Sequence, residues 1–180
     1  AQKRFHFRVE HVDLRRANTE KLAGEVATVI DEAFPDDWEL MPPTKEDILD
    51  EMQSLLQYTK TDLIVMAYAG DRPVGILVCF PDYNRLLKTS RGKLFPFGWM
   101  ALLFKKVRAV RCSMMFVTPD FQNKAVNVAM TLSAYERALA MGITEVEAST
   151  IDETNVASIL ATERTGAKRY RVYRQYELTL

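Results

Sequence analysis

The alternation of apolar and polar residues divides the first half of the chain into strands and helices. Apolar residues at every second position in FHFRV, 5–9, predict a first strand. Apolar residues at helical spacing over 18–34 predict a helix, and the capping-box pattern TKED, which starts at Thr44, begins a second helix. Two apolar runs at 63–69 and 74–80, joined by the turn GDRP, predict an antiparallel hairpin.

The second half of the chain has the same kinds of pattern in a different order. Residues 107–117 are strand-like, 124–141 have helical spacing, and 143–151 are strand-like again. A strand, a helix and a strand in this order imply a parallel crossover. A further helix over 155–165 and a last strand in RYRVYRQYEL, 169–178, complete the pattern. We therefore expect a mixed α/β fold, with a mostly antiparallel sheet that contains a parallel central pair.

The length and charge of the chain indicate how many domains it forms and which partners it is expected to bind. Its 180 residues suit one domain, 1–180, which is long enough to bury a core. Lys and Arg (24) balance Asp and Glu (24), so no overall field would attract nucleic acid or an anionic membrane. In KRYRVYR, 168–174, alternation would let the aromatic side chains pack on one face while the arginines are solvated on the other. We expect no nucleic-acid partner, and any anion site must be local.

Cysteine and histidine usage gives no sign of a metal centre. Cys79 and Cys112 each lie in an apolar run with no second thiol nearby, which argues against a disulfide framework or a zinc site. His6 and His11 lie five residues apart on the predicted strand, hence on opposite faces, and cannot share a metal ion there. The start of the chain, AQKRFHFRVEHVDL, lacks the apolar core of a signal peptide. These features are typical of a reduced, cytoplasmic protein.

The stretch VTPDFQNKAVNVAM, 117–130, joins the first strand of the crossover to its helix. Val117 closes the strand, Pro119 turns the chain, and residues 122–127 lie where the helix begins. Where a strand runs into a turn and then a helix, free backbone amides and the positive end of the helix dipole form an anion site. The sequence therefore predicts a phosphate-binding turn.

The order of elements around this turn resembles the GNAT superfamily of acyl-CoA N-acyltransferases, over nearly the whole chain. The loop of that family usually reads Gln or Arg, two variable residues, Gly, one variable residue, and then Gly or Ala. Ala125 stands at the first glycine and Asn127 at the last small position. The first turn of a helix needs no positive φ, so alanine is expected to fit the backbone at position 125. The segment 81–103 also resembles an insert in one poorly characterised branch of this superfamily.

The resemblance implies transfer of an acyl group from acetyl-CoA, or from a longer acyl-CoA, to a small-molecule primary amine by direct attack. It implies that Val117 positions the thioester carbonyl and that Asn155 contacts the pantetheine arm. The tyrosine that many members place seven residues after this Asn would fall on Thr162 and is missing. The residues implied to hold the pyrophosphate are Gln122, Asn123, Lys124, Ala125, Val126 and Asn127. Two alternatives stay open: an acyl carrier protein as donor, and a non-catalytic binding domain with a degenerate loop.

Deprotonation of an acceptor amine requires a general base, commonly a carboxylate. Glu145 and Glu147 share one face of the predicted strand 143–151, and Asp152 follows its end. Glu147 is the first candidate for the base and Asp152 is the second. Solvent-facing carboxylates without a catalytic role are the alternative.

Eleven residues, LFPFGWMALLF at 94–104, form an apolar segment between Arg91 and Lys93 on one side and Lys105 and Lys106 on the other. A membrane span needs about 17 to 25 residues, so we expect no transmembrane segment here. The segment could be a lid over a long acyl chain, an interfacial patch, a homodimer contact or part of the core.

Overall fold

The computed structural model describes residues 1–34, 41–58, 63–84, 107–148, 150–174 and 176. The chain divides into two compact units, Ala1–Ser149 and Thr150–Leu180, and the sheet lies in the first of them. The prediction of one domain over 1–180 therefore stays a prediction. The apolar segment 94–104 and its predicted roles lie outside the described residues. None of the described helices is both long and apolar enough to cross a membrane.

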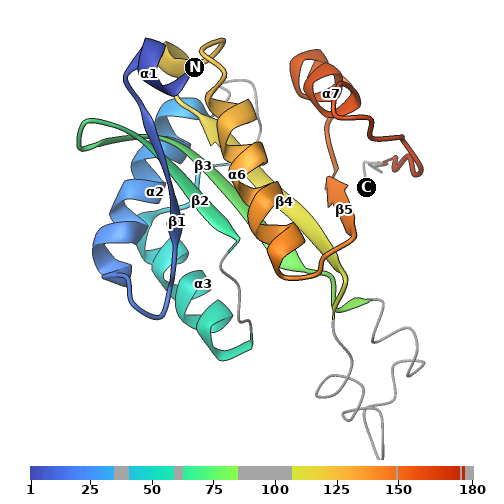
Figure 1. Ribbon diagram of the computed structural model, residues 1–180. Coiled ribbons are helices and arrows are strands. Elements are labelled where there is room, and N and C mark those ends of the chain that lie inside the picture. Colours follow the sequence, from blue (N-terminus) through green and yellow to red (C-terminus); the bar gives the residue numbers. More distant parts are fainter. Residues whose placement is uncertain (35–40, 59–62, 85–106, 149, 175, 177–180) are drawn as a thin grey trace, which may run out of the picture. The chain divides into compact units, whose positions relative to one another are not determined.

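Five strands form one sheet in the order β1-β2-β3-β4-β5 (Figure 1). Strands β1 to β4 pair antiparallel with their neighbours, and β4 pairs parallel with β5. The predicted hairpin and parallel crossover are confirmed, but the parallel pair lies at the end of the described sheet and not at its centre. The strands are β1 (Arg8–Val12), β2 (Ile64–Ala69), β3 (Arg72–Pro81), β4 (Ala109–Val117) and β5 (Glu145–Ala148).

The N-terminal residues differ from the sequence prediction. Helix α1 (Gln2–Phe5) comes first, His6 has a φ of 52°, and strand β1 begins only at Arg8. The predicted strand start at residue 5 is therefore wrong, and His6 does not share a strand with His11. Phe7 is nevertheless buried in the core. The apolar residue at this position therefore indicates burial, although Phe7 is not part of a strand. Among the described residues, no group of three or more His, Cys, Asp or Glu side chains could hold a metal ion.

Helices α2 (Thr19–Ala33) and α3 (Lys45–Tyr58) cover one face of the sheet (Figure 1). The side chain of Asn18 caps the start of α2. The predicted capping box begins α3, because the amide and hydroxyl of Thr44 donate to Asp47 and the amide of Asp47 donates back to Thr44. The core on this face includes Leu22, Val26, Ile30 and Met52 from the helices and Ile64, Met66, Ile76 and Val78 from the strands.

Helix α6 (Val126–Ala140) covers the other face of the sheet (Figure 1). Gly75 in β3 lies beneath its first turns, where an added Cβ would come within 3.2 Å of both Val126 and Met130. Gly75 pairs with Val117, so this close packing lies where β4 ends and the turn begins. The absence of a side chain at position 75 therefore lets the start of α6 approach the sheet. The buried residues of α6 are Val126, Met130, Ala134 and Ala138.

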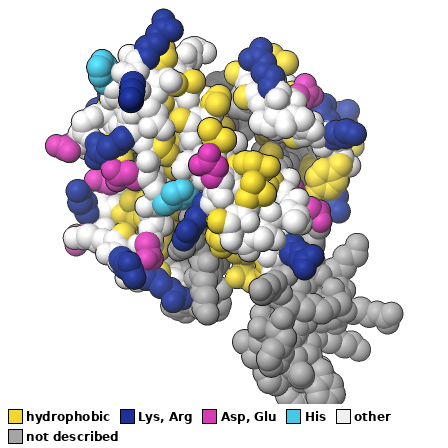
Figure 2. Space-filling model, viewed as in Figure 1, with side chains coloured by type: hydrophobic (Ala, Val, Ile, Leu, Met, Phe, Trp, Pro, Cys, Tyr) yellow, Lys and Arg dark blue, Asp and Glu magenta, His cyan; other side chains and the backbone are white. Residues whose placement is uncertain are grey.

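The opposite side of α6 carries exposed apolar side chains, and Figure 2 shows hydrophobic side chains at the surface over this helix. They lie three or four residues apart and therefore form one stripe along the helix. A shallow hollow of about 340 Å³ lies beside it, lined among others by Val9, Ala125 and Ser133. The Ser133 hydroxyl lies 2.9 Å from Nε2 of His11. The exposed apolar residues are Val128, Leu132, Tyr135 and Leu139.

A bulge in β4 brings the two cysteines together. Val78 pairs with Met114 and Cys79 pairs with Cys112, so Ser113 is left over in the register. The Ser113 hydroxyl donates to the carbonyl of Val78. At the next pair, the Sγ atoms of Cys79 and Cys112 are 2.7 Å apart. The expectation of no second thiol nearby is wrong, because antiparallel pairing joins residues that are distant in sequence.

In the second unit, Asn155 caps helix α7 (Val156–Glu163), which confirms the predicted helix in a shorter form. Gly166 has a φ of 86°, a conformation that suits glycine at the end of a helix. Residues 167–174 form no strand, so the predicted last strand is wrong over this part. The side chains of KRYRVYR are exposed, and the expected packing of its aromatic residues is wrong because no strand sorts them onto one face.

Candidate functional site

The turn after β4 is anchored to the sheet by Thr118, which is fully buried. The amide and the hydroxyl of Thr118 both donate to the carbonyl of Val74 in β3, at 3.0 and 3.4 Å. The 3-10 helix η1 (Pro119–Phe121) follows, and the amide of Gln122 donates back to the carbonyl of Thr118. These contacts fix the start of the turn relative to β3.

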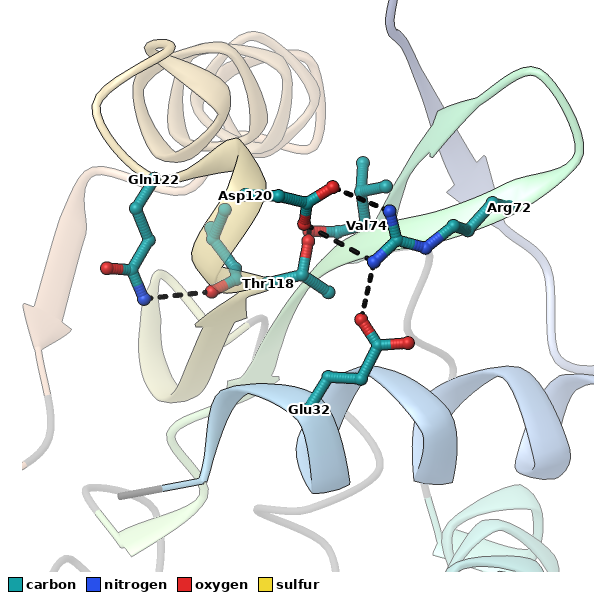
Figure 3. A network of polar contacts seen from close by, with 7 residues as sticks. Glu32, Arg72, Val74, Thr118, Asp120 and Gln122 are labelled. Carbon is teal, nitrogen blue, oxygen red and sulfur yellow. Dashed lines mark hydrogen bonds and ion pairs between the residues drawn. The ribbon is translucent and has the colours of Figure 1, made fainter. Parts of the chain in front are cut away.

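Arg72 joins this turn to helix α2 (Figure 3). Its guanidinium donates to Asp120 in η1 and to Glu32 in α2, each at 2.6 Å. The hydrogen bond from Arg72 holds the pKa of the Asp120 carboxyl below its ordinary value. All three side chains are partly exposed, so each ion pair contributes at most about 1 kcal/mol. The sequence pattern does not indicate a role for Arg72, because its contacts depend on tertiary packing and on no local motif.

The loop between η1 and α6 uses left-handed backbone at two residues. Asn123 has a φ of 61° and Ala125 a φ of 60°. The expectation that position 125 needs no positive φ is therefore wrong: Ala125 is the residue before the helix, and α6 begins at Val126, not at Lys124. Asparagine tolerates this conformation, whereas a residue with an ordinary Cβ loses about 1–2 kcal/mol in it.

Several backbone amides at the start of α6 donate to no protein acceptor among the described residues, and they are called the open amides below. Ala125 has no side-chain group that could cap the helix, and the first turn contains no acidic residue. Open amides and the positive end of the helix dipole together favour an anion at this point. In the described part of the chain, the residues whose amides donate to no protein acceptor here are Asn123, Ala125, Val126, Asn127 and Val128.

The side chains of Gln122 and Lys124 contact the turn itself. Nε2 of Gln122 donates to the carbonyl of Val117 at 3.3 Å (Figure 3). The Lys124 ammonium lies 4.5 Å from the centre of the Phe121 ring. Gln122 therefore ties the loop to the end of β4, and Lys124 adds a positive charge next to the open amides.

The parallel pairing of β4 with β5 ends before β4 does. The pairs run from Ala109 with Glu145 to Cys112 with Ala148, whereas β4 continues to Val117. Among the described residues, no strand pairs with this last part of β4 on the β5 side. An extended ligand could therefore form main-chain hydrogen bonds along this edge, directly before the turn with the open amides.

Two oppositely charged residues face each other on the parallel strands. Arg111 in β4 and Glu147 in β5 are register partners, with 2.9 Å between Nη2 and Oε1. Nε of Arg111 is buried and has no hydrogen-bond partner among the described residues. Glu147 was predicted as a site residue from the sequence and Arg111 was not, although a charged residue inside an apolar strand was a usable signal. The predicted base thus lies in an ion pair.

The remaining predicted residues lie in the second unit and make local contacts. The Asp152 carboxylate accepts hydrogen bonds from the hydroxyl and the amide of Thr154, at 2.6 and 2.8 Å, and these bonds lower the pKa of Asp152. A lowered pKa makes this carboxylate a weaker base. Oδ1 of Asn155 accepts from the amide of Ser158 and so caps α7. Both residues therefore have a structural role, and their functional roles stay predictions.

Similar sequences come from two bacteria. Bacterial ceramide synthase of Caulobacter vibrioides (strain NA1000 / CB15N) is 28% identical over 180 residues, which cover 94% of this chain and 47% of that protein. Protein YghO of Escherichia coli (strain K12) is 28% identical over 177 residues, which cover 92% of this chain and 45% of that protein. The chain therefore spans about half the length of these curated relatives.

Solved structures share the fold at low sequence identity. An aminoglycoside acetyltransferase from an uncultured soil metagenomic sample, in complex with sisomicin, matches with a TM-score of 0.63 and 12% identity over 99% of this chain and 100% of that chain. An aminoglycoside N-acetyltransferase in complex with CoA matches with a TM-score of 0.60 and 13% identity over 97% of this chain and 96% of that chain. The model of the acetyltransferase (GNAT) family matches residues 28–167, and the chain therefore belongs to this family.

Proposed function

We propose that this chain transfers an acyl group from acyl-CoA to the primary amine of a small molecule, by direct attack within a complex of both substrates. The observation that supports this most strongly is the group of open amides at the start of α6, next to the part of β4 that has no described strand partner on its β5 side. A pyrophosphate has the charge and the acceptor oxygens that such amides bind. Direct attack needs no covalent intermediate, so neither cysteine has a role in the transfer.

Different residues would bind different parts of the donor. In this proposal the amides within residues 122–127 that have no protein acceptor, those of Asn123, Ala125, Val126 and Asn127, bind the pyrophosphate, and Lys124 adds a positive charge beside it. Val117 positions the thioester carbonyl, and the hydrogen bond from Gln122 to Val117 keeps these two parts of the turn together. Asn155 would contact the pantetheine arm through Nδ2, because its Oδ1 caps α7.

Glu147 is the proposed general base, acting on the acceptor amine directly or through a water molecule. Its place on β5, one residue before the last parallel pair, supports this role. Arg111 would hold the carboxylate in one orientation through their ion pair. Asp152 is the second candidate, and its hydrogen bonds with Thr154 make it the weaker one.

The names of the relatives support an amine acceptor. A ceramide is the amide of a fatty acid with a long-chain amino alcohol, so a ceramide synthase among the relatives favours a long acyl chain and a long-chain amine. An aminoglycoside N-acetyltransferase also acts on an amino group. We therefore propose a long-chain acyl donor, with acetyl-CoA as the alternative.

The left-handed backbone at Ala125 favours a second candidate function. This residue stands where the family has a glycine, and it carries a Cβ beside the proposed pyrophosphate site. A donor bound to acyl carrier protein depends less on this loop, because it has no pyrophosphate. A non-catalytic binding domain is the remaining alternative.

An acyl-transfer assay separates these possibilities. Thioesters of CoA with about two to sixteen carbons and matched acyl carrier protein thioesters are offered with primary amines, and the amide is detected by mass spectrometry. Each buried methylene contributes up to roughly 0.8 kcal/mol, so donor affinity should rise about three- to fourfold per carbon until the site is full. Amide formation with CoA donors supports the proposal. Amide formation with carrier-protein donors alone supports the second candidate, and no amide from either donor contradicts acyl transfer.

A further inference from the structure

We propose that Cys79 and Cys112 are a thiol pair that closes into a reversible disulfide across strands β3 and β4. The two residues are register partners, and their Sγ atoms are 2.7 Å apart. A disulfide has about 2.0 Å between its sulfur atoms, so less than about 1 Å of movement joins them. This inference holds whether or not the chain transfers acyl groups.

The backbone at this pair suits a cross-strand disulfide. The amide of Cys79 donates to the carbonyl of Leu63, on the side of β3 that faces away from β4. Cys79 and Cys112 therefore form a non-hydrogen-bonded pair, in which the Cα atoms of antiparallel partners are about 4.5 Å apart. Disulfides span Cα separations of about 4.4–6.8 Å. The bulge at Ser113, directly beside the pair, adds local twist that helps the two side chains to adjust.

The two thiols differ in access and in acidity. Cys79 is buried, whereas Cys112 is partly exposed. The hydrogen bond between the two side chains lowers the pKa of Cys112 and raises the pKa of Cys79. The thiolate is the form that reacts with oxidants, so Cys112 reacts first and Cys79 follows.

A hydroperoxide is the class of oxidant that this pair would take. The Cys112 thiolate attacks one oxygen of hydrogen peroxide, the O–O bond breaks, and a sulfenic acid forms on Cys112 while hydroxide leaves and is protonated to water. The sulfur of Cys79, after losing its proton, then attacks the Cys112 sulfur. The S–S bond forms and the second hydroxide leaves as water. In total two thiols lose two electrons and two protons, and one peroxide becomes two waters.

The disulfide would lie where the pairing of β4 with β5 ends. Cys112 is the last residue of β4 that pairs with β5, and it precedes the bulge. A bond from Cys112 to Cys79 would brace β3 and β4 there and close a long loop of the unfolded chain. The oxidised protein should therefore melt about 5–10 °C higher than the reduced protein.

Intact-mass spectrometry tests the proposal. The full chain is treated with stoichiometric hydrogen peroxide, unfolded, and alkylated with N-ethylmaleimide. We expect a monomer that is lighter by about 2 Da and takes up no maleimide, and dithiothreitol should restore both thiols. A protein that already shows this state when isolated, and regains both thiols with dithiothreitol, supports the proposal equally.

Two single variants serve as matched controls. Cys112→Ser should keep Cys79 open to alkylation after the same treatment, and Cys79→Ser should stop at an oxidised Cys112. Neither variant should show the higher melting temperature. The proposal is overturned if wild-type protein gains oxygen on Cys112 while Cys79 still takes up maleimide, if both thiols survive, or if the disulfide joins two chains.

Discussion

Arg111 and Glu147 face each other on the parallel strands β4 and β5, with 2.9 Å between Nη2 and Oε1. The ion pair lies next to the point where β5 ends, and β4 continues beyond it in pairing with β3. A carboxylate here is suited to accept a proton from an amine bound beside the edge of β4 that extends past β5. It is equally suited to hold two strands together, and substitution of the carboxylate separates these roles.

Glu147→Gln should lower the rate of acyl transfer by about a hundredfold to ten-thousandfold if the carboxylate is the general base. CoA affinity should be nearly unchanged, because the proposed pyrophosphate site lies on other residues. The matched control is Glu145→Gln, two positions earlier on the same strand, which should keep the rate. Steady-state kinetics and calorimetry give both quantities. Full turnover by Glu147→Gln would mean that the ion pair is structural and that the base is another group.

Ala125→Gly should stabilise the protein by about 1 kcal/mol, because glycine adopts a φ of 60° without the steric cost of a Cβ. Ala129→Gly in the interior of α6 is the matched control and should destabilise the protein by about 0.5–1 kcal/mol. Urea unfolding measures both changes. A loss of stability in Ala125→Gly would contradict the left-handed conformation at this residue.

Gly75→Ala should destabilise the protein by about 1–3 kcal/mol, since the new Cβ would come within 3.2 Å of Val126 and Met130. It should also weaken CoA binding, because α6 would have to shift at its first turns. Gly24→Ala in α2 is the control: its Cβ would meet Lys45 only at an ordinary distance of 3.8 Å, and the helix should gain about 0.5–1 kcal/mol. Equal stability of the two variants, measured by urea unfolding, would contradict the close approach of α6.

Asp120→Asn should cost at most about 1 kcal/mol at neutral pH, because the ion pair with Arg72 is partly exposed. The pKa of Asp120 is lowered in the folded protein from an ordinary value of 3.8. Its stabilising contribution is therefore complete above pH 3.8 and is lost as the pH falls through the lower, folded-state pKa. Urea unfolding at decreasing pH should show the difference between wild type and variant shrinking in this acid range. The exposed residue Asp50 supplies the control Asp50→Asn, and a difference for Asp120→Asn that grows in acid would reverse the assigned sign.

Asn155→Ser and Asn155→Ala separate capping of α7 from contact with the donor. Serine keeps a hydroxyl that can cap the helix, whereas alanine should cost about 1 kcal/mol of stability. If Asn155 also contacts the pantetheine arm, both variants should raise KM for acyl-CoA. A normal KM in Asn155→Ser would leave this residue with the capping role alone.

Local sequence patterns were sufficient to predict those features that depend on residue type and spacing within one stretch of the chain. The capping box of Thr44 and Asp47 and the strand–helix–strand crossover follow from residue type and spacing. The positive φ of Ala125 could not be predicted in this way. The pattern of apolar and polar side chains does not indicate the backbone angles of a loop in which alanine stands at a glycine position.

Contacts between distant residues were beyond the sequence pattern for a different reason. The pair Cys79–Cys112 depends on the exact register of β3 and β4, which the bulge at Ser113 shifts by one residue. The pair Arg111–Glu147 depends on the exact register of β4 and β5. A shift of one residue changes which side chains face each other. The sequence could therefore identify Glu147 as a candidate, but not the guanidinium that holds it.

Whether the amides at the start of α6 bind the pyrophosphate of CoA can be decided by an NMR titration. The ¹⁵N-labelled protein is titrated with CoA and, separately, with pantetheine, which lacks the pyrophosphate. We expect CoA to shift the amide signals of Asn123, Ala125, Val126, Asn127 and Val128, and pantetheine to leave them nearly unchanged. Unchanged signals from these five amides at saturating CoA would contradict pyrophosphate binding at this point.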